Sequence, residues 1–237
     1  MVFKIIYMFS FAVRTFFMKH GFLSNQIKNY VGTDEASGLI QLDLLKKTGC
    51  NSSSNVLEIG CGALHLSIPL IKYLEKNKYV GVDPNSWLRE KNVNNNQNLI
   101  DQKQAIFLNV EDFDVSTLTR KFDFIFSHSI LSHVAHWQLE QFLKNCSNVL
   151  SKDGKILSSI VLAEGNEFGS KGSKDKKDSM DEEWVYPFIS WFRLSTVKQM
   201  ASKYDLLVEH KPEYTEHYTK NTKPHEFHDW LIFYKNS

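Results

Sequence analysis

The middle of the chain alternates short apolar runs with segments of helical periodicity. Residues 55–62 (NVLEIGCG) predict a strand that stops at two glycines one residue apart. Apolar positions then recur at helical spacing, and Pro69 fits a first helical turn, so we expect the regular helix to begin near Ser67. Residues 79–83 (YVGVD) predict a second strand that ends on a carboxylate. This order is typical of the nucleotide-binding half of a doubly wound α/β sheet.

Shorter apolar runs predict further strands later in the chain. Residues 92–98 (NVNNNQN) are mostly polar and predict a loop. Residues about 163–183 are rich in Gly, Ser, Lys and Asp, and predict a flap above a ligand site or a bare linker. The additional strands are expected at residues 105–108, 155–161, 206–210 and 229–234.

The N-terminal segment is strongly apolar and needs a separate interpretation. Its uncharged run, residues 5–13, ends at Arg14 and is too short for a membrane span, which needs roughly 20 apolar residues. No small-x-small cleavage site follows it, which disfavours a signal peptide. We predict a helical cap over residues 1–50 that packs on the rest of the chain. Peripheral docking on a membrane, a dimer or partner contact, and a targeting role stay as alternatives.

Composition excludes several classes of protein. The chain has 237 residues, of which 42% are apolar and 23% charged, as is typical of a globular protein with its own core. Its 28 basic and 27 acidic residues give a net charge of +1, so the composition offers no basic footprint for nucleic acid. Cys50, Cys61 and Cys146 form no CxxC pair, which suits free thiols in a reducing compartment. We therefore expect a cytoplasmic protein.

The glycine turn distinguishes between nucleotide cofactors. A dinucleotide site of the form GxGxxG needs a third glycine where this chain has His65, which disfavours a nicotinamide-dependent oxidoreductase. The chain instead carries an acid two residues before the first glycine, in the pattern Glu58-x-Gly60-x-Gly62. This pattern resembles motif I of the class I S-adenosylmethionine (SAM)-dependent methyltransferases.

The resemblance continues through further segments in the same order. Residues 79–88 (YVGVDPNSWL), 122–134 (FDFIFSHSILSHV) and 149–156 (VLSKDGKI) resemble segments of a bacterial branch associated with small-molecule and surface-glycan modification. The chain departs from the family at Leu64, where a further glycine is common. It also departs at His65, where that branch usually has arginine.

The resemblance implies a fold and a place for each part of SAM. The family's fold is a Rossmann-like, doubly wound seven-stranded α/β sheet with an antiparallel C-terminal hairpin, here in one SAM-binding domain over residues 51–237. By this resemblance Asp83 holds the ribose, Glu58 orients the glycine turn, and the turn passes beside the methionine part of SAM. The corner after the third strand meets the adenine, although an ordinary polar turn is the alternative there. The implied cofactor-binding residues are Glu58, Gly60, Cys61, Gly62, Asp83, Pro84, Asn109, Val110, Glu111 and Ser127.

Methyl transfer to a hydroxyl needs a group that takes the released proton. Ligands bind at the carboxyl ends of parallel strands, so the residues after the fourth strand are the first candidates. His133 and His128 lie there, and histidine titrates near neutral pH, so we take them as candidate catalytic bases, with His136 a weaker one. A capping or packing role is the alternative for each. No Cys or carboxylate completes a metal-ligand spacing, so no metal is predicted.

The acceptor is predicted mostly by exclusion. Methyltransferases that act on amines of nucleic-acid bases carry [DNS]-P-P-[YFW] after the fourth strand, whereas residues 127–130 read SHSI here. We therefore predict a small-molecule or glycan acceptor, methylated on a hydroxyl oxygen, and no nucleic-acid partner. A catalytically silent SAM-fold interaction protein stays the alternative to an enzyme. One aromatic cluster suits stacking on a sugar or burial in the core: Trp184, Tyr186, Phe188, Trp191 and Phe192.

Overall fold

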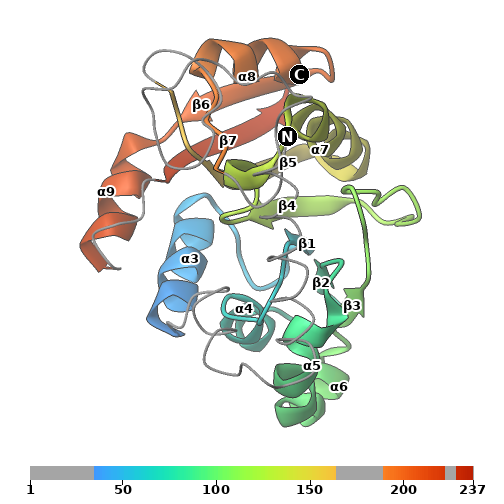
Figure 1. Cartoon of the computed structure of the whole chain (residues 1–237). Coiled ribbons are helices and arrows are strands. Elements are labelled where there is room, and N and C mark those ends of the chain that lie inside the picture. Colours follow the sequence, from blue (N-terminus) through green and yellow to red (C-terminus); the bar gives the residue numbers. More distant parts are fainter. Residues whose placement is uncertain (1–34, 164–188, 222–227, 237) are drawn as a thin grey trace, which may run out of the picture.

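The fold is a mixed sheet covered by helices. The computed structural model describes residues 35–163, 189–221 and 228–236, and seven strands in these ranges form one sheet in the order β3-β2-β1-β4-β5-β7-β6 (Figure 1). The strands from β1 to β5 pair in parallel, whereas β7 pairs antiparallel with both β5 and β6. This topology confirms the predicted Rossmann-like sheet with its C-terminal hairpin. The strands are β1 (Val56–Ile59), β2 (Tyr79–Val82), β3 (Ile106–Leu108), β4 (Phe122–Ser127), β5 (Leu150–Ile160), β6 (Leu206–His210) and β7 (Asp229–Lys235).

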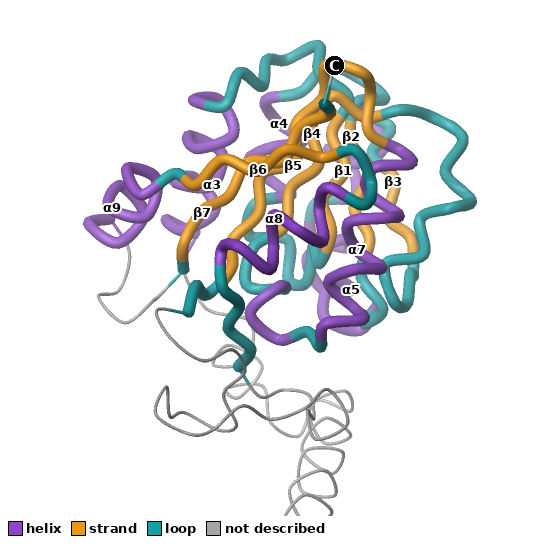
Figure 2. Tube along the Cα trace, turned by 90° about the horizontal axis from the view of Figure 1, so that it is seen from above, coloured by secondary structure: helices purple, strands orange, loops and turns teal. Residues whose placement is uncertain are grey.

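Helices cover both faces of the sheet, as the tube view shows (Figure 2). One core layer packs beneath α3, α4 and α9, and the other beneath α7 and α8. Alternate residues of a strand enter opposite layers: Val56 packs in the first and Leu57 in the second. The helices are α3 (Glu35–Lys47), α4 (Ser67–Tyr73), α5 (Ser86–Asn95), α6 (Gln97–Lys103), the 3-10 turn η1 (Leu131–His133), α7 (His136–Val149), α8 (Leu194–Ser202) and α9 (Pro212–Asn221).

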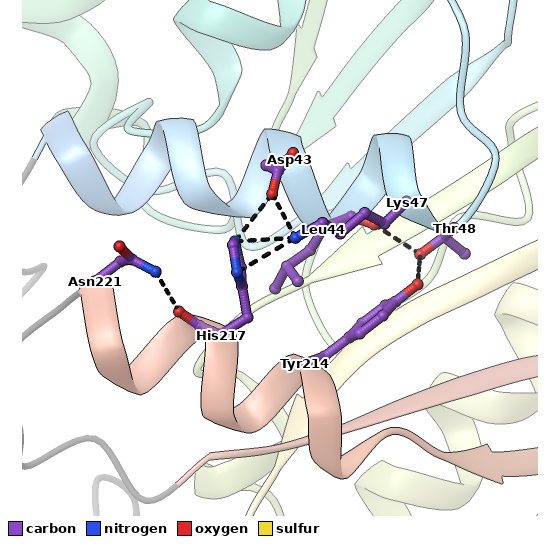
Figure 3. A network of polar contacts seen from close by, with 7 residues as sticks. All are labelled: Asp43, Leu44, Lys47, Thr48, Tyr214, His217 and Asn221. Carbon is purple, nitrogen blue, oxygen red and sulfur yellow. Dashed lines mark hydrogen bonds and ion pairs between the residues drawn. The ribbon is translucent and has the colours of Figure 1, made fainter.

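Polar contacts link α3 to α9, although the two helices lie far apart in the sequence (Figure 3). The Asp43 carboxylate is 2.9 Å from both Lys47 Nζ and His217 Nε2. Thr48, just after α3, has its hydroxyl 3.4 Å from that of Tyr214 on α9. These contacts lie between the insertion that joins β6 to β7 and the helix that precedes β1, above the core layer that both helices share.

Two local predictions are wrong. The expected loop over residues 92–98 is helical, because α5 continues to Asn95 and α6 begins at Gln97. Asparagine amides bond to carbonyls there: Asn92 Nδ2 donates to the Ala63 carbonyl at 2.7 Å. The polar run thus marks a largely solvent-facing helical surface. In addition, β5 begins at Leu150, which pairs with the first residue of β4 ahead of a register irregularity, rather than at residue 155.

Several predictions concern segments outside the described residues. The predicted cap over residues 1–50 is described only from residue 35, where α3 is helical and packs on α4 and α9, so the domain division stays a prediction. The predicted flap and three aromatic residues of the cluster, Trp184, Tyr186 and Phe188, also lie outside. The other two, Trp191 and Phe192, are buried in the core. Within the described ranges, no helix combines the length and apolar character needed to cross a membrane.

Candidate functional site

The two glycines after β1 have different structural roles. Both have positive φ, +78° at Gly60 and +44° at Gly62. A Cβ on Gly60 would lie 2.2 Å from Cδ1 of Ile130, in the segment after β4, whereas a Cβ on Gly62 would meet only the Gly60 carbonyl oxygen, at 3.9 Å. Gly60 is therefore required by packing between two strand ends. Gly62 leaves its backbone open to the close approach of a ligand.

The turn continues past Gly62 in a backbone conformation that favours glycine, although no further glycine follows in the turn. Leu64 has a φ of +67°, so the chain adopts the left-handed conformation at the position where the sequence lacks the family's additional glycine, and the leucine side chain is buried. Cys61 is also buried, and burial raises the pKa of its thiol. Its N–H donates to the Val82 carbonyl at 3.1 Å, which ties the turn to β2.

Helix α3 lies directly against the segment that follows the turn. A Cβ on Gly38 would be 2.0 Å from the carbonyl oxygen of His65, so glycine is needed for this approach. His65 replaces the arginine of the related branch, and its buried Nε2 has no hydrogen-bond partner among the described residues. The described part of the predicted cap therefore borders the glycine turn.

Asp83 connects the glycine turn to the end of β2. Its Oδ2 accepts a hydrogen bond from the Gly62 N–H at 3.0 Å, and its Oδ1 accepts one from the Asn85 N–H at 2.7 Å. The side chain is buried, and burial raises the pKa of the carboxyl despite these bonds. Each carboxylate oxygen keeps a further lone pair for a ligand hydroxyl. The geometry fits an acid that presents its oxygens beside an open backbone.

Glu58 is a buried acid that joins β1, β2 and α4. Its Oε2 accepts hydrogen bonds from the Tyr79 hydroxyl at 2.6 Å and from the Ser67 hydroxyl at 2.8 Å. Burial raises the pKa of this carboxyl to about 7, although the two hydroxyls oppose the shift. These contacts suit the predicted role of orienting the turn.

The ends of β2 and β3 are joined by a residue that sequence reasoning missed. Arg89 on α5 donates from Nη1 to the Asp83 carbonyl at 3.2 Å and from Nη2 to Asn109 Oδ1. It is a single buried arginine in a polar helix, and no motif in the sequence marks it. The other predicted residues here differ in burial: Val110 packs partly against the core, whereas Glu111 and Pro84 are exposed.

The end of β4 is held mainly by serines. Ser127 is fully buried, with its hydroxyl oxygen 2.7 Å from that of Ser158 on β5. The chain then turns at Ser129, where φ is +57° and the N–H donates to Ser159 Oγ at 2.8 Å. This turn places the following residues over the carboxyl ends of β4 and β5.

His128, His133 and His228 come together at this edge. The ring of His128 lies 5.0 Å from Tyr218, 5.1 Å from His228 and 5.4 Å from Trp230, on which it stacks. Burial lowers the pKa of His128 well below its usual value. Burial, together with the charge of nearby His133, lowers the pKa of His228 to about 4.

Sequence reasoning missed His228 as a site residue. The residue stands just before β7, whose first residue, Asp229, pairs with Ile160 at the end of β5. Because β7 runs antiparallel, its beginning lies at the same edge as the carboxyl ends of the parallel strands. The signal was present in the sequence, since a histidine before an antiparallel last strand must lie at that edge.

His136 and His217 make contacts outside this group. His136 begins α7 and its ring meets Phe192 edge-on at 5.3 Å, while His217 belongs to the α3–α9 contact. His225 lies outside the described residues. Among the residues that are described, no three His, Cys, Asp or Glu side chains gather as metal ligands.

A comparison with protein families decides the assignment. The family model described as a methyltransferase domain matches residues 34–211, which is well over half of the chain. The chain belongs to this methyltransferase family. The predicted family, enzyme class and cofactor are thereby confirmed: the protein is a class I methyltransferase that uses SAM.

Solved structures agree on the fold of the methyltransferase. It resembles a SAM-dependent methyltransferase from Clostridium acetobutylicum at a TM-score of 0.62 and 12% identity, over 92% of this chain and 99% of that one. It also resembles the magnesium protoporphyrin IX methyltransferase of Synechocystis with bound SAM, at 0.60 and 14%, over 95% and 96% of the chains. The CcbJ methyltransferase of Streptomyces caelestis matches at 0.58 and 12%, over 86% and 90%.

The residues of the methyltransferase fit the cofactor. The open backbone at Gly62 lies next to the buried Asp83 carboxylate, and the two are hydrogen-bonded. Asn109 stands at the end of the neighbouring strand and is fixed through Arg89. A nucleoside with an aminoacyl chain needs these elements together: an acid for hydroxyls, and a bare main chain for close approach.

Proposed function

We propose that this methyltransferase transfers the methyl group to a hydroxyl oxygen of a small molecule or glycan. The observation that carries the proposal is the group formed by His128, His133 and His228 at the carboxyl end of β4. Burial lowers the pKa of His128 and His228, so both imidazoles are neutral near pH 7 and are weaker bases than an exposed histidine. A neutral imidazole accepts a proton, and a hydroxyl must release one when it is methylated.

For the cofactor, we propose that Asp83 accepts hydrogen bonds from the ribose hydroxyls with the lone pairs that Gly62 and Asn85 leave available. The main chain of the glycine turn then lies along the methionine part, oriented by Glu58. Bound SAM supplies a methyl carbon that its sulfonium activates for displacement. The remaining residues of the proposed cofactor site are Gly60, Cys61, Pro84, Asn109, Val110, Glu111 and Ser127.

His133 is the proposed catalytic base. It takes the proton that the acceptor hydroxyl loses when its oxygen bonds to the methyl carbon and the carbon–sulfur bond breaks. Its place on η1, beside the turn that packs on Gly60, supports this role. His128 is the second candidate, because three aromatic or imidazole rings surround it and favour a packing role.

Three observations support a small-molecule acceptor. The net charge of +1 offers no general attraction for a polyanion, and SHSI after β4 lacks the segment that holds base amines. A solved neighbour of the same fold is named as a methyltransferase of magnesium protoporphyrin IX, so the fold serves a small-molecule acceptor in that protein.

The proposal is tested by transfer of tritiated methyl from SAM to simple probes. Methyl hexopyranosides and catechol serve as hydroxyl probes, and aniline, which has no hydroxyl, serves as the amine control. We expect the label only on the hydroxyl probes. Mass spectrometry of the products should place the added methyl group on an oxygen. His133→Ala should lower kcat by at least about 100-fold without changing the affinity for S-adenosylhomocysteine (SAH), whereas the surface control His217→Ala should match wild type. Transfer to nitrogen alone, or an unchanged rate in His133→Ala, would contradict the proposal.

A further inference from the structure

Ser132, at the centre of η1, is bonded to two residues from other segments of the chain, Ser190 and His228. Its carbonyl oxygen accepts a hydrogen bond from the Ser190 N–H at 2.7 Å. Its hydroxyl oxygen lies 3.3 Å from Nε2 of His228. The segment before α8 and the segment before β7 are therefore both fixed to the turn that carries His133.

Both of these residues hold a buried polar atom that no described residue satisfies. Ser190 is fully buried, and its hydroxyl has no hydrogen-bond partner among the described residues. The same holds for Nδ1 of His228, whose other ring nitrogen faces Ser132. Buried polar atoms are normally hydrogen-bonded, and each one left without a partner destabilises the folded state. Two residues with such atoms are bonded to one serine at the carboxyl-end edge of the sheet, which indicates a ligand that completes the bonding of these atoms.

We propose that Ser190 and His228 form a subsite that binds a second hydroxyl of the acceptor, next to the hydroxyl that is methylated. This inference rests on the proposed hydroxyl acceptor, and it specifies that acceptor further as a molecule with neighbouring hydroxyls. Because both residues are bonded to Ser132, and His133 follows it in sequence, the subsite lies next to the proposed base.

The chemistry of the two atoms favours a hydroxyl over a charged group. A neutral imidazole carries one N–H, so Nδ1 of His228 either donates or accepts, according to the tautomer that Ser132 selects. The Ser190 hydroxyl does both, and a ligand hydroxyl matches either case. The carboxylate of Asp229 is already bonded, to His210 Nε2 at 3.1 Å and to the Leu162 N–H at 3.1 Å. It therefore does not serve as the counter-charge for an acceptor amine here, and neither serine nor neutral histidine would balance an acceptor carboxylate.

The test compares a hydroxyl probe with its deoxy analogue in wild-type and variant enzymes. The probe is a methyl hexopyranoside that accepts tritiated methyl. Its deoxy analogue lacks the hydroxyl next to the hydroxyl that is methylated. In wild type we expect kcat/KM for the deoxy analogue to be about tenfold lower, because one hydrogen bond to a buried group is lost. In Ser190→Ala and His228→Leu this difference should largely disappear, while SAH affinity stays at the wild-type value.

The possible results separate this inference from the proposed function. The subsite would be overturned if both variants preferred the probe over its deoxy analogue by the same factor in kcat/KM as wild type does. It would also be overturned if wild type showed no preference. Failure of wild type to methylate any hydroxyl probe, with SAH still bound, would instead overturn the hydroxyl acceptor itself. Ser190→Ala removes a single oxygen, so it keeps the test valid if His228→Leu does not fold. His217→Ala, in the α3–α9 contact, is the matched histidine control and should keep the wild-type preference.

Discussion

Buried polar groups at the ends of β1 to β3 differ in their hydrogen bonding from those at the ends of β4 to β7. In the first half, Asp83 and Glu58 are bonded to backbone N–H groups and to hydroxyls of neighbouring elements. In the second half, Ser190 Oγ, His228 Nδ1 and Trp230 Nε1 are buried without a hydrogen-bond partner among the described residues. His65 Nε2 is an exception in the first half. The half proposed to bind the cofactor thus has most of its buried polar groups bonded within the protein, whereas the half proposed to bind the acceptor has several without a partner among the described residues.

Burial also shifts titration in opposite directions in the two halves. It raises the pKa of Glu58 to about 7 in the cofactor half, and it lowers the pKa of His228 to about 4 in the acceptor half. In both cases the neutral form is favoured, because transfer of a charge out of water is unfavourable. The halves therefore respond to pH with opposite signs, which provides a way to examine them separately.

The largest expected effect comes from the contact that joins the halves. Gly60→Ala places a Cβ 2.2 Å from Cδ1 of Ile130 at a φ of +78°, so both overpacking and backbone strain act, and the free energy of unfolding should fall by about 3 kcal/mol. Urea unfolding followed by circular dichroism measures this change.

Two further variants identify the cause of that loss. Gly62→Ala meets only a carbonyl oxygen at 3.9 Å and should lose about 1–2 kcal/mol from backbone strain alone. Ile130→Ala combined with Gly60→Ala should be more stable than the sum of the single effects predicts, by about 1 kcal/mol or more. Additive effects, or a Gly62→Ala loss as large as that of Gly60→Ala, would show that the two halves do not meet at this contact.

Glu58→Gln isolates the titration of the cofactor half. The folded pKa of about 7 lies above the usual 4.5, so the folded state binds more protons between these values. Wild-type stability therefore falls as pH rises through this window, by up to about 3 kcal/mol. Glutamine keeps an oxygen for the Tyr79 and Ser67 hydroxyls but does not titrate, so its unfolding free energy should lack this component. Urea unfolding at pH 5, 6, 7 and 8 tests this; parallel curves for both proteins would contradict it.

His228→Asn isolates the opposite response of the acceptor half. The folded pKa of about 4 lies below the usual 6.5, so the unfolded state binds more protons between these values. The contribution of His228 to the free energy of unfolding is therefore fully present above pH 6.5 and is lost as the pH falls toward 4. We expect a loss of about 2 kcal/mol, which is less than the full pKa shift implies because the residue is not fully buried. The variant should lose this dependence over pH 4–7 in the same unfolding measurement. The prediction would be contradicted if His228 made the wild-type protein less stable as the pH rises.

The smallest expected effect is at the α3–α9 contact. Asp43 and Lys47 have side chains that are 45% and 44% exposed, and exposed ion pairs contribute less than about 1 kcal/mol. Lys47→Met should therefore change the unfolding free energy by less than about 1 kcal/mol, and 1 M salt should reduce the difference. Thermal melts of both proteins at low and high salt measure it. A large loss would mean that this contact, rather than the core beneath α3 and α9, holds the two helices together.

The sequence predicted the glycine turn and the acid at the end of β2, but not the contacts of Ser190 and His228 with η1, for a physical reason. The glycine turn and Asp83 lie within one strand–helix–strand unit, so their spacing along the chain reflects their spacing in the fold. His228 reaches η1 through the pairing of β5 with β7, and Ser190 reaches it through the bridge between Leu162 and Phe192. No local pattern of residues encodes either approach. Arg89 was missed because its partners are a backbone carbonyl and a residue on the next strand. The loop predicted at residues 92–98 failed because polarity alone does not separate an exposed helix from a loop.

The central claim is that the buried Asp83 carboxylate beside the glycine turn forms the SAM site. Isothermal titration calorimetry with SAH tests it on the wild-type protein, on Asp83→Ala, and on Asp114→Ala, an exposed acid after β3 that serves as the control. We expect one SAH per chain for wild type and for the control, and at least about a 100-fold weaker affinity for Asp83→Ala, since charge-assisted hydrogen bonds to the ribose are lost. Equal affinity of a folded Asp83→Ala protein would contradict this placement of the cofactor.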